Sequence, residues 1–190
     1  MTSAVEILGN KYTIRDRNKQ FDLLSSEGKR VAIAQDVIAQ VLKGFITPEA
    51  GLYVNAWSFK NESCRVCAIG AVAVSCFNSK AHDVTRNLTE FSELATYFDM
   101  DNLREMEAAF ECCGDFRVDD LPSARNYYDF WGDDSDNWHS EHNRLLLIFS
   151  NVINNGGTFH PDYLENEIEA FKRDGDRYFS KITGVSGDLS

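Results

Sequence analysis

Three of the five cysteines of the chain lie close together, between Cys64 and Cys76. Cys67 stands where a helix is expected to begin, and a helix N-terminus lowers the pKa of a thiol. His139 and His142 lie downstream, and cysteine hydrolases combine such groups, because a base must deprotonate the thiol. The sequence therefore admits a thiol hydrolase or transferase with Cys67 as nucleophile. The more ordinary interpretation is that Cys67 is a small buried apolar residue, as free cysteines usually are.

A zinc site is a second use for the thiols. Cys64 and Cys67 form a C-x-x-C pair, which has the spacing of half a zinc site. The other half would have to come from Cys112 and Cys113, which are adjacent, so each would give one sulfur to a metal with a histidine completing the set. No second C-x-x-C or H-x-x-x-H motif occurs, so zinc stays an alternative.

The segment from residue 115 to residue 141 differs from the rest of the chain. It holds eight acidic residues and only two arginines, interleaved with tyrosine, phenylalanine and tryptophan. Tyr and Trp supply contact area with a polar handle, and carboxylates attract a basic partner, so a long loop of this kind predicts a docking surface. The alternative is that the aromatic residues fill a small core under the loop while the carboxylates face water. The residues expected to bind the partner are Asp119, Asp120, Tyr127, Tyr128, Asp129, Trp131, Asp133, Asp134 and Asp136.

The composition limits the class of partner. The chain has 190 residues, a formal net charge of −11 and a pI near 4.7. Direct binding to nucleic acid or to an anionic membrane requires a basic patch, so the expected partner is another protein with a basic surface. The N-terminus has no secretory signal, no apolar run is long enough to span a membrane, and the cysteine number is odd. These features predict a cytoplasmic protein with reduced thiols and no cofactor.

The cysteine-rich stretch must itself be positioned by the fold. Its small residues would let another element approach closely, so it is expected to form a buried helix over 67–77, with the thiols near one end. The β-branched valines leave a buried strand as the alternative. The small residues are Ala68, Gly70, Ala71 and Ala73.

The remaining pattern predicts a single, mainly α domain of five to seven helices, with a short strand or hairpin in the N-terminal third. Apolar residues at helical spacing predict helices at 28–43, 82–98, 103–113, 144–153 and from His160-Pro161 onward. The 144–153 helix is apolar on every side and should be the most buried. Residues 1–24 are expected to be partly irregular, the chain to fray after Gly175, and residues 184–190 to form a flexible tail.

Several segments together resemble a family of uncharacterised small proteins from bacteria and their phages. No single segment carries the resemblance, which depends on their order and spacing. It implies a bacterial or phage origin and transfers no catalytic residue. The segments are Arg30–Gln40, Cys64–Ala71, Met106–Glu111, Arg144–Phe149 and Asn155–Pro161.

The function expected from the sequence is non-enzymatic. Acidity and the resemblance together suggest an interaction protein, such as a phage-encoded inhibitor that occupies the basic, nucleic-acid-binding groove of a bacterial defence protein. The alternatives are the thiol enzyme centred on Cys67 and a small zinc-stabilised protein that uses Cys64 and Cys67. The oligomeric state is left open.

Overall fold

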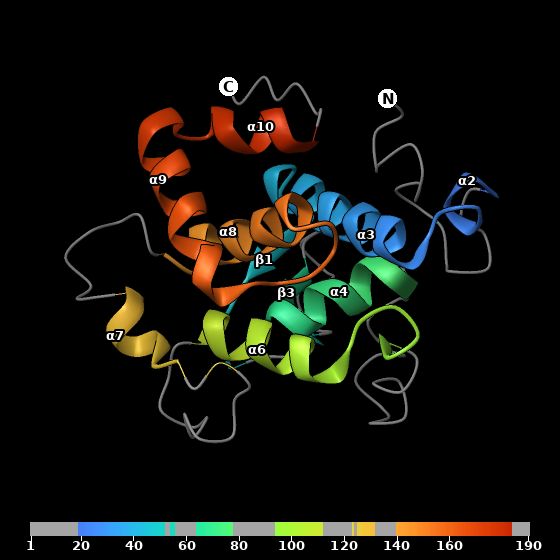
Figure 1. Cartoon of the computed structure of the whole chain (residues 1–190), viewed down its shortest axis with the longest axis horizontal. Coiled ribbons are helices and arrows are strands. Elements are labelled where there is room, and N and C mark those ends of the chain that lie inside the picture. Colours follow the sequence, from blue (N-terminus) through green and yellow to red (C-terminus); the bar gives the residue numbers. More distant parts are fainter. Residues whose placement is uncertain are drawn as a thin grey trace.

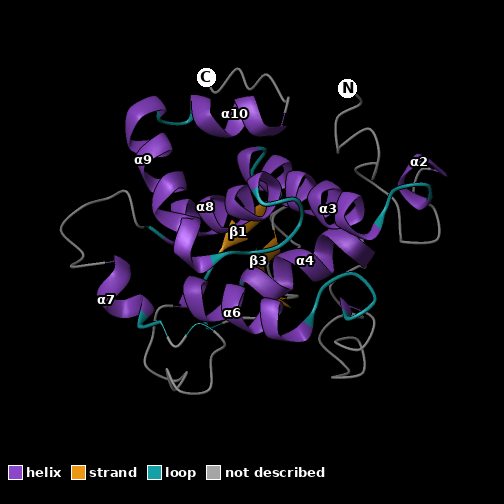
Figure 2. Cartoon of the chain, viewed as in Figure 1, coloured by secondary structure: helices purple, strands orange, loops and turns teal. Residues whose placement is uncertain are grey.

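The computed structural model of the chain describes residues 19–51, 54–55, 64–77, 94–111, 123, 125–131 and 140–183. Helices surround a small sheet in this part of the chain, as Figure 2 shows. Six helices of seven residues or more are described: α3 (Ser26–Leu42), α4 (Ala68–Phe77), α6 (Met100–Glu111), α8 (Glu141–Asn154), α9 (Leu164–Asp174) and α10 (Arg177–Thr183). Shorter elements are α2 (Lys19–Asp22), α7 (Tyr127–Trp131) and the 3-10 helix η5 (Pro161–Tyr163). The predicted mainly α fold is confirmed.

Helices α3 and α8 pack against each other at the centre of the molecule (Figure 1). Ser25 begins α3 by accepting a hydrogen bond from the Gly28 N–H at 3.1 Å, and such an N-cap is worth about 1 kcal/mol. In α8 every residue from Arg144 to Val152 is buried, so the expected burial of this helix is confirmed. None of the described helices has the length and apolar character needed to cross a membrane.

The cysteine-rich stretch forms the predicted helix, because Val72 and Val74, which left a strand open, lie in α4; a short strand that was not predicted precedes it. Residues Cys64–Val66 are strand β3, and α4 begins two residues later at Ala68. Strand β3 pairs in parallel with β1 (Ile46–Pro48) and antiparallel with β2 (Val54–Asn55), which gives the order β1-β3-β2. The buried small residues of α4 allow close packing against α3 and α6. Cys67 therefore lies at the junction of strand and helix.

The loop after α8 is held by two asparagine side chains. Asn151 pairs with the backbone N–H and C=O of His160, at 2.8 and 3.1 Å, and Asn102 pairs in the same way with Phe159, at 3.1 and 2.9 Å. Gly157 has a φ of +98°, and a Cβ at this position would lie 2.8 Å from the Glu27 carbonyl oxygen. The loop therefore requires glycine at this position, where it passes the first turn of α3.

One local expectation is wrong, and three others fall mostly outside the described residues. The chain does not fray after Gly175, because α10 follows and buries Tyr178 and Phe179 against the core. The cap of α8 is Ser140, which accepts from the Asn143 N–H at 3.3 Å. The expected 82–98 helix is described only from residue 94. Residues 1–18 and 184–190 lie outside the described part.

Candidate functional site

Cys67 is the sequence-predicted site residue that the structure places most clearly. Its side chain is 0% exposed, and its Sγ accepts a hydrogen bond from the Gly70 N–H at 3.4 Å. The thiol thus lies at the N-terminal end of α4, where the sequence predicted it. Burial makes it inaccessible from the surface of this conformation.

Two glutamates of α6 approach this thiol. Glu107 and Glu111 lie one helical turn apart on the same face of α6, because residues four apart on a helix are neighbours. The Cys67 Sγ and one carboxylate oxygen of each glutamate lie within 4.8 Å of one another, and all three residues are buried. The structure therefore assembles a buried cluster, named here the Cys67–Glu107–Glu111 cluster, from the α4 end and one face of α6.

Backbone N–H groups fix the two carboxylates. Glu107 Oε2 accepts from the Ile69 N–H at 2.9 Å, within the first turn of α4. Glu111 Oε2 accepts from the Gly51 N–H at 2.6 Å, in the turn that follows β1. Each glutamate therefore links α6 to another element, and its side chain is held in one orientation.

The electrostatics of the cluster keep the thiol protonated. Burial, followed by the charge and hydrogen bond of Glu107, raises the pKa of Cys67 well above its ordinary value. Burial also raises the pKa of Glu107 to about 7, against the opposing effect of its hydrogen bonds to Cys67 and Ile69. A thiol nucleophile needs a lowered pKa and access to substrate, so these properties do not favour the thiol-enzyme alternative.

The other predicted catalytic and metal-binding residues are not assembled around Cys67 in the described part of the chain. His142 is exposed on the first turn of α8. Cys64 begins β3, so extended backbone separates its Cα from that of Cys67 by about 10 Å. Nothing of the Cys64 side chain is described. His139, Cys112 and Cys113 lie outside the described residues.

The acidic, aromatic segment is described around α7, and there it differs from the expected docking surface. Tyr127 and Trp131 are only 4% and 3% exposed. Trp131 Nε1 donates to the Ala109 carbonyl at 2.7 Å, and the Tyr127 hydroxyl donates to the Glu105 carboxylate. The prediction that these two rings contact a partner is therefore corrected. They fill the core under the loop, because their polar atoms find partners on α6.

The remaining predicted partner-binding residues are outside what the structure describes. Tyr128 and Asp129 lie in α7, but nothing of their side chains is described. Asp119, Asp120, Asp133, Asp134 and Asp136 lie outside the described residues.

Sequence reasoning missed Glu107 and Glu111. A signal for them exists, because they follow Leu103 at steps of four and so continue the buried stripe of α6. Carboxylates on such a stripe are usually assigned to the solvent-facing side of a helix. Only the packing of α4 and the β1 turn against α6 shows that they are buried.

Comparison of the chain with models of protein families, with curated proteins and with solved structures finds no match. The resemblance to uncharacterised bacterial and phage proteins therefore stays a prediction.

Proposed function

We propose that the protein acts by binding a basic surface of another macromolecule through its acid-rich segment, residues 115–141. One observation carries this proposal. The segment has a net charge of −6, more than half of the −11 of the whole chain, within 27 residues. Negative charge concentrated in this way attracts a basic partner over a distance of about 10 Å at moderate salt.

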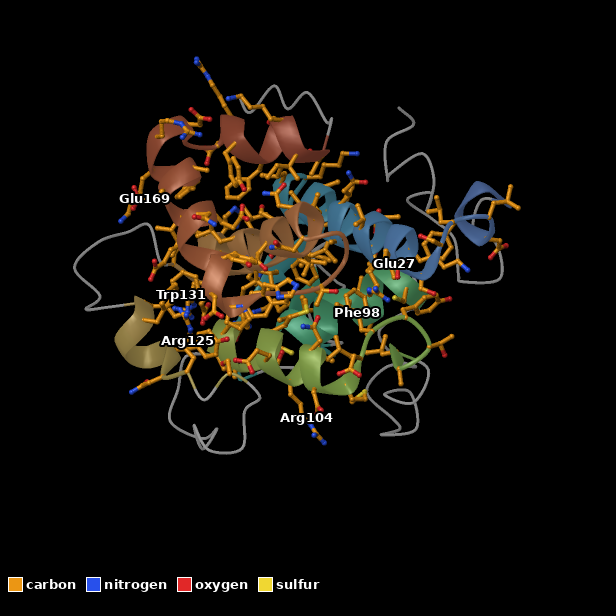
Figure 3. All side chains as sticks on the ribbon, viewed as in Figure 1. Glu27, Phe98, Arg104, Arg125, Trp131 and Glu169 are labelled. Carbon is orange, nitrogen blue, oxygen red and sulfur yellow. The ribbon has the colours of Figure 1, made fainter. Side chains whose placement is uncertain are left out.

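The attachment of α7 supports the proposal. The buried Tyr127 and Trp131 tie this part of the segment to α6, and Arg125 forms an ion pair with Asp162 of η5 at 2.9 Å. Figure 3 shows Arg125 and Trp131 together at the α7 end of the molecule, far from Glu27. The rings of Tyr127 and Trp131 therefore anchor α7 to α6 and do not themselves contact the proposed partner.

The surface beside α7 is also suited to a basic partner. Tyr163 of η5 is 51% exposed, and Asp162 and Glu165 beside it are exposed as well. The side chains of Asn102 and Asn151, called here the two asparagine clamps, hold the preceding residues Phe159 and His160 in place. Tyrosine is enriched among the residues that contribute most to binding at protein interfaces.

The proposed mode of action is competition. A carboxylate-rich surface that binds a basic groove excludes the phosphates for which that groove is suited. This mode needs no chemical step and is consistent with the buried, protonated Cys67. Inhibition of a nucleic-acid-binding protein, as expected from the sequence, is the specific form that we propose.

Capture experiments test the proposal. The tagged full-length chain would be incubated with bacterial lysate at about 50 mM and about 500 mM NaCl, and bound proteins identified by mass spectrometry. We expect basic proteins that are retained at low salt, lost at high salt and displaced by added DNA. In the segment variant Asp133→Asn/Asp134→Asn/Asp136→Asn these proteins should be lost.

A matched control removes the same number of charges outside the acid-rich segment. Asp22 of α2, Glu27 of α3 and Asp101 of α6 are exposed, and Glu27 lies across the molecule from Arg125 and Trp131 (Figure 3). The triple variant Asp22→Asn/Glu27→Gln/Asp101→Asn should capture the same proteins as the wild type. Equal loss in both triple variants would reduce the effect to net charge and contradict docking through the acid-rich segment.

A further inference from the structure

The Cys67–Glu107–Glu111 cluster combines three donor atoms of the types that bind transition metals. One sulfur comes from the β3–α4 junction and two carboxylates from α6, all buried and mutually within 4.8 Å. Zinc ligands in a tetrahedral site are separated by somewhat less than this, since metal–sulfur and metal–oxygen distances are about 2.3 and 2.1 Å. Small side-chain adjustments would therefore bring the three atoms around one ion.

The two carboxylates are positioned in advance. The Ile69 and Gly51 N–H groups each bind one oxygen of a glutamate, at 2.9 and 2.6 Å. Groups that bind metal ligands from behind in this way fix their orientation and raise the affinity for the metal. The Gly70 N–H does the same for the sulfur at 3.4 Å.

A zinc site was left open by the sequence as an alternative. In it, Cys112 and Cys113 would each give one sulfur beside Cys64 and Cys67. Cys112 and Cys113 follow Glu111 directly in the chain, and Glu111 reaches Cys67 in the fold. The alternative from the sequence and the donor cluster of the structure share Cys67.

We propose that Cys67, Glu107 and Glu111 bind one divalent transition-metal ion, and that Zn²⁺ is the ion that suits this donor set. A thiolate excludes Mg²⁺ and Ca²⁺, which take oxygen ligands, and two carboxylates disfavour Cu⁺, which takes soft ligands. On binding, the Cys67 thiol releases its proton to solvent and the sulfur bonds to the metal. The ion would link the β3–α4 junction to α6.

Cobalt is the probe for the test, because Co²⁺ occupies zinc sites and its bond to a thiolate gives a charge-transfer band in the near ultraviolet. Full-length protein treated with a chelator would be titrated with Co²⁺ and then with Zn²⁺. We expect one equivalent of Co²⁺ to produce the band and Zn²⁺ to abolish it. Glu107→Gln and Glu111→Gln should each weaken Co²⁺ binding by about tenfold or more.

Two controls on the same helices separate a site from non-specific binding. Cys67→Ser should lose the charge-transfer band, while Cys76→Ser, which alters a second buried thiol that lies in α4, should keep it. Glu105→Gln, on α6 and also buried, should bind Co²⁺ like the wild type. A band that persists in Cys67→Ser, or no band in the wild type, would overturn the proposal.

A measurement on the unaltered protein keeps the test valid if a variant fails to fold. X-ray absorption of the zinc-loaded wild type should show at least one sulfur near about 2.3 Å together with oxygen near about 2.1 Å. A first shell of sulfur alone, or of oxygen and nitrogen alone, would contradict the proposed ligands. Neither result bears on the docking proposal, which is tested at other residues, Asp133, Asp134 and Asp136.

Discussion

At the scale of single residues, the sequence located Cys67 but could not show its surroundings. The position of Cys67 at the start of a helix and the small residues that follow it are local properties of the chain, and both are as predicted. The burial of Glu107 and Glu111 depends on contacts with residues about 40 to 60 positions away along the chain, such as Ile69 and Gly51. No local pattern contains that information.

The aromatic residues of the acid-rich segment illustrate the same limit. Trp131 and Tyr127 each carry one polar atom, so the sequence is equally consistent with an interface or with a core. The nearby Ala109 carbonyl and Glu105 carboxylate decide for the core.

Asp36 gives a pH prediction at this scale. It accepts hydrogen bonds from Ser75 at 2.7 Å and from Gln40, yet burial raises its pKa from 3.8 to about 6. The folded state therefore favours the protonated carboxyl. Asp36 stabilises the fold below about pH 4, and this contribution is lost as the pH rises to about 6, by about 3 kcal/mol in total.

Asp36→Asn should remove that dependence. Relative to the wild type, its free energy of unfolding should rise by about 2 kcal/mol between pH 4 and pH 7, measured by urea denaturation at each pH. The exposed Asp101→Asn is the control and should follow the wild type. Parallel pH profiles for Asp36→Asn and wild type would show that Asp36 is already ionised at low pH in the folded protein.

At the scale of elements, hydrophobic periodicity predicted the long helices well. α3, α6 and α8 were expected from apolar residues at helical spacing, and each is present. The cysteine-rich stretch was ambiguous between strand and helix because small and β-branched residues alternate in it, and packing against α3 and α6 decides for the helix α4. The helix α10 was missed because a glycine and a charged turn precede it, although Tyr178 and Phe179 are both buried.

The loop between α8 and η5 supports a prediction about backbone geometry. Gly156 and Gly157 both have positive φ, but only a Cβ at residue 157 would meet backbone, at 2.8 Å from the Glu27 oxygen. Gly156→Ala should cost about 1 kcal/mol for the left-handed conformation alone. Gly157→Ala should cost more than about 2 kcal/mol, because the loop must also move away from α3.

Urea denaturation of both variants measures this difference directly. Equal destabilisation would mean that the loop moves away from α3 at little cost and that the two asparagine clamps do not fix it.

At the scale of the whole molecule, two features meet at α6: the buried metal-binding candidate and the acid-rich segment. The Cys67–Glu107–Glu111 cluster is buried between α4, α6 and the β1 turn, and α7 of the acid-rich segment is joined to α6 by the hydrogen bond from Trp131 Nε1 to the Ala109 carbonyl. The sequence alone was enough to find the acid-rich segment, since the charge of each residue and its position along the chain do not depend on the fold. The Cys67–Glu107–Glu111 cluster could be found only from the fold, because its three residues come from two separate stretches of the chain.

The most direct test of the proposed function is the salt dependence of binding to a captured basic partner. Dissociation constants of the wild type and of the Asp133→Asn/Asp134→Asn/Asp136→Asn variant would be measured by fluorescence anisotropy from about 50 to about 300 mM NaCl. The wild type should weaken by about tenfold or more over this range, and the variant should bind more weakly at low salt with a shallower dependence. A wild-type affinity that does not change with salt, or a variant that matches it throughout, would contradict docking through the acid-rich segment.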